Sequence, residues 1–129
     1  SERESDSHDV PAMFFIGMKD KDYRIEGISE IYFEGAEDEA LWCLLREPNQ
    51  GHGQGASQRY AMKYYRTIIP MRLPLGEDQL QSLDRSDGWV GHLETFEIAA
   101  ADAADWDPEV TSWFPTEELA EDWVKVVKP

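Results

Sequence analysis

The segment 115–128 constrains the fold most, because its apolar residues recur at helical spacing along one face. These apolar residues are Leu119, Trp123, Val126 and Val127. Acidic residues stand in the first turn and lysines in the last, which is the order that the helix macrodipole favours. The pattern predicts a C-terminal amphipathic helix whose apolar face packs on a core.

Most other apolar segments are short and rich in β-branched and aromatic residues, which favours strands. We therefore expect strands over 12–18, 23–26, 29–33, 59–69 and 93–98. The segment 36–46 begins with acids and ends with an arginine, which indicates a helix, although a strand over 40–45 fits its apolar residues as well. A short helix is expected over 77–84, and 99–105 can turn helical before Pro108.

The elements are expected to close round one core. The chain has 129 residues, no internal repeat and no obvious linker, which suits one domain. We predict an α+β fold in which an antiparallel sheet of about five strands carries two or three helices on one face. The domain is expected to span 11–129, after a flexible lead-in over 1–10.

Charge narrows the choice of partners. The 27 acidic and 12 basic residues give a formal net charge of −15. Such a chain repels nucleic acid and anionic membranes at long range and attracts basic surfaces. We therefore expect a basic protein partner and no direct nucleic-acid binding, while solubility or a salty habitat would explain the same charge.

Cysteine usage and hydropathy indicate the compartment. Cys43 is the one cysteine in the sequence, so no intramolecular disulfide can form, which favours a reducing setting. The polar first residues have no apolar core of a signal peptide, and no apolar run approaches the length of a membrane span. We expect a cytoplasmic protein that does not enter a membrane.

Catalytic and metal-binding motifs are missing from the sequence. It has no nucleophile elbow, no phosphate-binding glycine loop ending in lysine, and no paired histidines at the spacing of a zinc helix. Asp102, Asp105 and Asp107 could hold a hard cation, but a solvated acidic loop explains them better because the spacing of a calcium loop is absent. The sequence predicts no catalytic site, no cofactor and no metal, and leans against an enzyme.

The acidic C-terminal part contains the predicted partner-binding residues. Tryptophans lie there among carboxylates, and aromatic anchors within complementary charge are typical of protein interfaces. The predicted contact residues are Asp102, Asp105, Trp106, Asp107, Trp113, Glu117 and Glu121.

A basic segment offers an alternative site. Arg59, Lys63, Arg66 and Arg72 follow the glycine-rich stretch 51–55, and no acidic residue lies between Pro48 and Gly76. These residues could bind an anion or a nucleotide, with tyrosines offering stacking surface. The alternative is that their charges pair with the acidic remainder of the fold.

Taken together, the residues favour a small acidic protein-binding module that recognises a basic partner protein and inhibits or neutralises it. Two alternatives stay open. One is an accessory subunit of a larger protein assembly, and the other is an anion-binding or nucleotide-binding domain that uses the basic segment 59–72.

Overall fold

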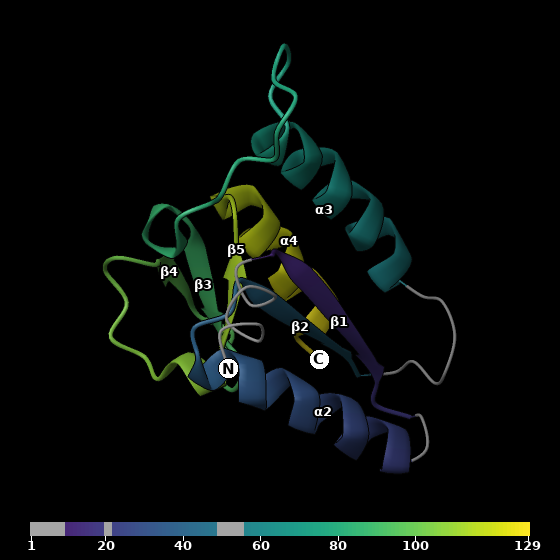
Figure 1. Cartoon of the computed structure of the whole chain (residues 1–129). Coiled ribbons are helices and arrows are strands. Elements are labelled where there is room, and N and C mark those ends of the chain that lie inside the picture. Colours follow the sequence, from purple (N-terminus) through teal and green to yellow (C-terminus); the bar gives the residue numbers. More distant parts are fainter. Residues whose placement is uncertain (1–9, 20–21, 49–55) are drawn as a thin grey trace.

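A β–α–β unit forms the N-terminal part of the fold (Figure 1). The computed structural model describes residues 10–19, 22–48 and 56–129. β1 (Ala12–Gly17) and β2 (Trp42–Glu47) pair in parallel, from Ala12 opposite Trp42 to Gly17 opposite Glu47. Adjacent parallel strands need a crossover connection, and α2 (Asp22–Glu37) supplies it. The expected strand over 12–18 is confirmed as β1.

The C-terminal part contains a three-stranded antiparallel sheet. β3 (Trp89–His92) lies in the centre, between β4 (Ile98–Ala100) and β5 (Thr111–Phe114). Two short 3-10 helices, η1 (Arg85–Asp87) and η2 (Pro108–Val110), precede β3 and β5. The described residues therefore form a small α+β fold with a two-stranded and a three-stranded sheet.

Side chains join the two sheets where β2 runs beside β5. The backbone N–H of Leu44 donates to Ser112 Oγ at 2.9 Å, and Trp123 Nε1 donates to the Leu44 carbonyl at 2.8 Å. Tyr32 Oη donates to the Thr111 carbonyl. A buried backbone group costs free energy when it lacks a partner, so these side chains replace the hydrogen bonds that a continuous ladder would have supplied.

Helices cover both sides of the β1–β2 pair (Figure 1). α2 lies on one side, where Phe14 of β1 packs against Tyr32 with ring centroids 5.8 Å apart. α3 (Ala56–Arg72) and α4 (Glu117–Val127) lie on the other side and pack on each other, with Tyr60 Oη donating to the Leu119 carbonyl at 2.8 Å. The sheet thus has a core on each face.

The C-terminal helix is confirmed as α4. Thr116 caps it, because its side chain accepts a hydrogen bond from the backbone N–H of Leu119. Leu119, Ala120, Trp123 and Val127 are buried, and Trp123 is fully enclosed. The amphipathic pattern was sufficient here because all of the large apolar residues of the helix turn toward the same side.

The expected single antiparallel sheet with helices on one face is wrong. The strands divide into a parallel pair and an antiparallel sheet of three, and α2 covers the face opposite α3 and α4. The reason is connectivity, since α2 between β1 and β2 supplies the crossover that a parallel pair needs. The expected lead-in over 1–9 and the glycine stretch 51–55 lie outside the described residues.

The strands expected over 23–26 and 29–33 are also wrong, because this segment forms α2. Ile25, Ile28, Tyr32 and Ala36 follow one another at helical steps and face the strands. Gly35 lets the helix approach closely, since a Cβ at this position would fall 2.0 Å from Cζ3 of Trp42. β-branched and aromatic content favoured strands locally, and packing decided otherwise.

The strand expected over 59–69 is a helix for the same reason. Tyr60, Tyr64 and Ile68 of α3 lie four residues apart and are buried. The alternation that a strand requires is absent, because Tyr64 is buried while Met62 two residues earlier is exposed.

Three further expectations need correction. The helix over 36–46 is wrong, and the alternative strand over 40–45 is nearer to β2, where Cys43, Leu44 and Leu45 are buried on both faces. No helix forms over 77–84, where Leu80 is exposed. The strand expected over 93–98 reduces to its last residue, since 93–95 form the turn between β3 and β4, and 101–103 turn after β4 without a helix.

Among the described residues, no helix is both long and apolar enough to cross a membrane.

Candidate protein-binding surfaces

The predicted aspartates lie on the surface of the segment that follows β4. Asp102, Asp105 and Asp107 are exposed. Trp106 is half-buried, and its indole packs edge-on against the His92 ring with centroids 5.3 Å apart. This segment offers carboxylates and one edge of an indole to a partner.

The remaining predicted contact residues lie elsewhere. Glu117 and Glu121 are exposed on α4, which begins beyond the end of β5 opposite to η2 and Asp107. Trp113 is only 2% exposed, and its Nε1 donates to the Arg85 carbonyl at 2.9 Å. Trp113 is therefore a core residue instead of the exposed anchor that we expected, and the acidic residues form two groups.

The predicted basic residues lie on α3 and divide between two roles. Lys63 donates to carboxylate oxygens of Asp122 and Glu118 on α4, and these hydrogen bonds raise the pKa of Lys63. Arg72 donates from Nε to the Gln81 carbonyl at 3.2 Å. Arg59 and Arg66 are exposed. Pairing with the acidic remainder thus accounts for Lys63, and the four cations do not converge on one anion.

The α3 outer face is an exposed apolar strip with cations along it. We define it as Arg59, Met62, Tyr65, Arg66 and Ile69, which follow one another at helical spacing. Ile69 is 58% exposed, Met62 53% and Tyr65 49%. Met62, Tyr65, Arg66 and Ile69 line an open hollow of about 440 Å³ together with Pro70. The fold buries the opposite side of α3 and leaves this strip in solvent.

The α2 outer face is its acidic counterpart. We define it as Glu30, Ile31, Phe33, Glu34 and Glu37, which line an open hollow of about 370 Å³. Ile31 is 55% exposed and Phe33 36%. The sequence interpretation missed this surface because a strand over 29–33 would have placed both apolar residues on one buried side. The glutamates at helical steps beside them were the available signal.

Carboxylates crowd at the end of this face. Partial burial, the neighbouring Asp107 and the contact with Glu37 raise the pKa of the Glu109 carboxyl in η2. α4 differs, because Lys63 contacts two of its acids, Glu118 and Asp122. The end of the α2 outer face therefore brings two carboxylates, Glu37 and Glu109, together.

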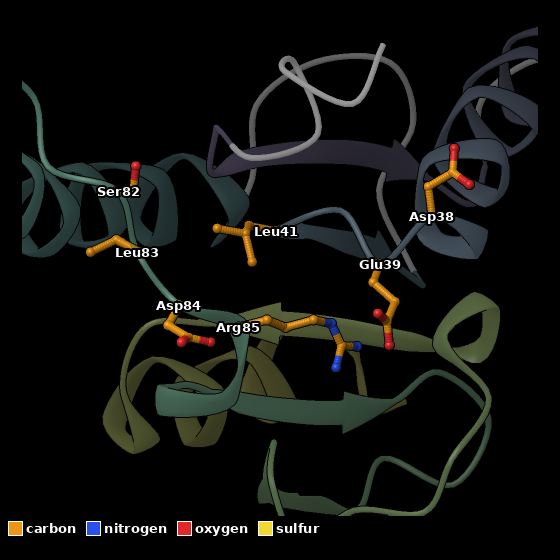
Figure 2. A pocket seen from close by; sticks show the side chains of 7 residues that line it. All are labelled: Asp38, Glu39, Leu41, Ser82, Leu83, Asp84 and Arg85. Atoms are coloured by element: carbon orange, nitrogen blue, oxygen red, sulfur yellow. The ribbon is translucent and has the colours of Figure 1, made fainter. Parts of the chain in front are cut away.

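A pocket of about 570 Å³ lies between the end of α2 and the segment before β3 (Figure 2). Glu39 closes α2 in the left-handed region with φ of 59°, and its side chain and that of Arg85 point toward each other across the pocket. Asp84 accepts hydrogen bonds from the Ser86 hydroxyl and N–H, which lower its pKa. The pocket is lined by both acidic and basic side chains, and the Asp84 carboxylate is already engaged in the turn with Ser86.

His92 and Cys43, two described side chains that could take part in chemistry, have structural roles. His92 Nδ1 accepts from the backbone N–H groups of Glu94 and Thr95 and so holds the turn after β3. Cys43 is fully buried, and burial raises the pKa of its thiol. No group of acidic, histidine and cysteine side chains suited to a metal ion occurs among the described residues.

Comparisons were made with protein-family models, curated proteins and solved structures. None of them gives a match. The surfaces of the chain itself are therefore the guide to its function, and α2 and α3 each expose apolar side chains that do not pack within the fold.

Proposed function

We propose that this chain is a small acidic protein-binding module that recognises a basic partner protein through the α2 outer face. The observation that carries the proposal is the exposure of Ile31 and Phe33 among Glu30, Glu34 and Glu37. Glu30, Glu34 and Glu37 follow one stripe of the helix, and Ile31 and Phe33 flank this stripe on its two sides, so a partner meets carboxylates and apolar side chains together. Covering them recovers roughly 25 cal/mol for each Å² of apolar surface removed from water.

The charge of the chain supports the same proposal. A formal net charge of −15 steers a basic protein toward the surface before contact. The exposed carboxylates Asp102, Asp105, Asp107, Glu117 and Glu121 add to this field from other sides of the molecule. A partner whose basic surface is covered in this way is neutralised, which is how such a module would inhibit it.

A charge-reversal pair tests the proposal. The probe is a synthetic amphipathic helical peptide with lysines on both sides of a leucine stripe, and the measurement is its affinity by fluorescence anisotropy. Glu30→Arg with Glu34→Arg should weaken binding at least about tenfold, the equivalent of about 1.4 kcal/mol. The matched control is Glu117→Arg with Glu121→Arg, which changes the net charge equally on α4.

The control separates a site from a general field effect. Binding that falls much further in the α2 variant than in the α4 variant supports the proposal. An equal loss of affinity in both variants would mean that the peptide responds only to the net charge of the chain, and it would contradict the proposed site. Higher salt should slow association of the parent chain, because screening shortens the range of attraction.

A further inference from the structure

We infer that the basic surface recognised by the α2 outer face is the α3 outer face of a second copy of this chain. The inference rests on the proposed function for the use of the α2 outer face, and it names the partner as a basic face on a chain of net charge −15 instead of a separate basic protein. It also gives the accessory-subunit alternative a definite form, in which the assembly is built from copies of the chain.

The two faces are complementary in charge. α3 contains no acidic residue, and its outer face exposes Arg59 and Arg66. The α2 outer face exposes Glu30, Glu34 and Glu37, and none of the five residues that define it is basic. Opposite charges placed at the rim of an interface fix its register and disfavour other pairings.

The two faces also match in spacing. Arg59 and Arg66 are separated by seven residues, as are Glu30 and Glu37. At 1.5 Å per residue each pair spans about 10.5 Å along its helix axis. The helices are 16 and 17 residues long, so one can lie along the other with both ion pairs formed. Ile31 and Phe33 lie on opposite flanks of the glutamate stripe, so one of them would then meet the strip of Met62, Tyr65 and Ile69.

The fold prevents a copy from covering its own faces. α2 and α3 lie on opposite sides of the β1–β2 pair (Figure 1). A contact between the α2 outer face of one copy and the α3 outer face of another is heterologous, so each added copy leaves one face of each kind free. The copies would grow into an open chain or close into a ring.

Net charge sets the conditions for this contact. Two copies at −15 each repel one another at low ionic strength. At about 0.15 M salt the Debye length falls to about 8 Å, which screens the distant charges and spares the pairs in contact. Association should therefore be weak, dependent on concentration and best seen near physiological salt.

Sedimentation velocity on the whole chain tests the inference. The parent should form species larger than a monomer as its concentration rises. Arg59→Glu with Arg66→Glu blocks the α3 outer face, and Ile31→Glu with Phe33→Glu blocks the α2 outer face. Each blocked variant alone should stay monomeric. An equal mixture should give a dimer and nothing larger, because the two blocked chains keep only one compatible pair of faces.

A charge swap supplies the rescue. A chain that carries Glu30→Arg, Glu37→Arg, Arg59→Glu and Arg66→Glu keeps the net charge of the parent, reverses both proposed ion pairs and should associate again. The control Lys125→Glu with Lys128→Glu on α4 changes the net charge as much as the α3 variant does, and it should not abolish association. Far-UV circular dichroism confirms that each variant is folded.

Several outcomes would overturn the inference. They are a parent that remains monomeric at every concentration, an association that either blocked variant retains, and a mixture that does not recover a dimer. If the parent is monomeric while the peptide probe still distinguishes the α2 variant from its α4 control, this inference fails and the proposed function stands. If the peptide probe binds the α2 variant and its α4 control equally, the proposed function fails whatever the sedimentation result.

Discussion

α3 and α4 pack against each other, yet they use their apolar residues differently. α4 turns Leu119, Trp123 and Val127 inward. α3 buries Tyr60, Tyr64 and Ile68 and also exposes Tyr65 and Ile69, together with Met62. The apolar content of α4 is thus used up by the fold, whereas α3 has a second apolar side that intramolecular packing does not need.

The same contrast holds for charge. Two of the four acids of α4 have cations nearby, because Lys63 contacts Glu118 and Asp122, and Lys125 lies 3.6 Å from Asp122. α2 resembles α3 in exposing apolar residues, and its last turn meets Glu109 instead of a cation. α4 therefore says little about function, whereas α2 and α3 have the exposed faces on which our proposals rest.

Two adjacent tyrosines of α3 give the largest expected difference. Tyr64 is fully buried, so Tyr64→Ala should lower the free energy of unfolding by about 3–5 kcal/mol, as for other large core residues. Tyr65 is 49% exposed, and Tyr65→Ala should change it by less than about 0.5 kcal/mol. Urea unfolding measures both. A similar decrease in the free energy of unfolding at the two positions would mean that Tyr65 stabilises the fold. The α3 outer face would then not be available to a partner.

Two glycines of α2 extend the comparison to the other exposed helix. A Cβ at Gly35 would clash with the Trp42 ring, so Gly35→Ala should destabilise the fold by about 1–3 kcal/mol. A Cβ at Gly27 meets no described atom within 4 Å, so Gly27→Ala should stabilise it by about 0.5–1 kcal/mol through helix propensity. Thermal unfolding of the pair checks the signs. A destabilising Gly27→Ala would show that this side of α2 is packed.

The buried hydroxyls of Tyr60 and Tyr64 differ in hydrogen bonding on the inner side of α3. Tyr60 Oη donates to the Leu119 carbonyl, so Tyr60→Phe should cost about 0.5–1.5 kcal/mol. Tyr64 Oη finds no hydrogen-bond partner among the described residues, so Tyr64→Phe should cost nothing or stabilise by up to about 1 kcal/mol. Chemical denaturation ranks the two variants. The reverse order would show that the Tyr64 hydroxyl has a partner.

The smallest expected effect concerns pH at the end of α2. The pKa of Glu109 lies above its ordinary value of 4.5 in the folded chain, so the folded state holds this proton more tightly than the unfolded state does. Its contribution to stability is therefore gained as pH falls through this raised pKa and lost as pH rises. Glu109→Gln should be more stable than the parent at neutral pH, and the gap should narrow in acid. If the difference in stability between Glu109→Gln and the parent did not vary with pH, repulsion between neighbouring carboxylates would not be its cause.

The sequence was a good guide where one period dominated. The C-terminal helix could be predicted because Leu119, Trp123 and Val127 repeat on one side only. α2 and α3 could not be predicted in this way, since apolar residues on two sides of a helix obscure the helical period, and β-branched and aromatic residues then favour a strand.

The surface that we propose differs from the one that the sequence indicates. The sequence indicates aromatic anchors among carboxylates at Trp106 and Trp113, and the structure leaves Trp106 half-buried and buries Trp113. The surface that we propose instead lies on α2, where Ile31 and Phe33 are exposed beside glutamates. The sequence pattern predicts a strand at these two residues. Of the predicted basic residues, only Arg59 and Arg66 belong to an exposed face, because Lys63 and Arg72 contact neighbouring segments.

The amino-acid sequence by itself determined the negative charge, the C-terminal amphipathic helix and the first strand, because these depend on composition or on a single local period. Only the tertiary structure decided which of two neighbouring aromatic residues is buried, as with Tyr32 and Phe33 or Tyr64 and Tyr65. The physical reason is that burial depends on what distant segments place against a residue. Trp42 and Thr111 meet Tyr32 from ten and 79 positions away.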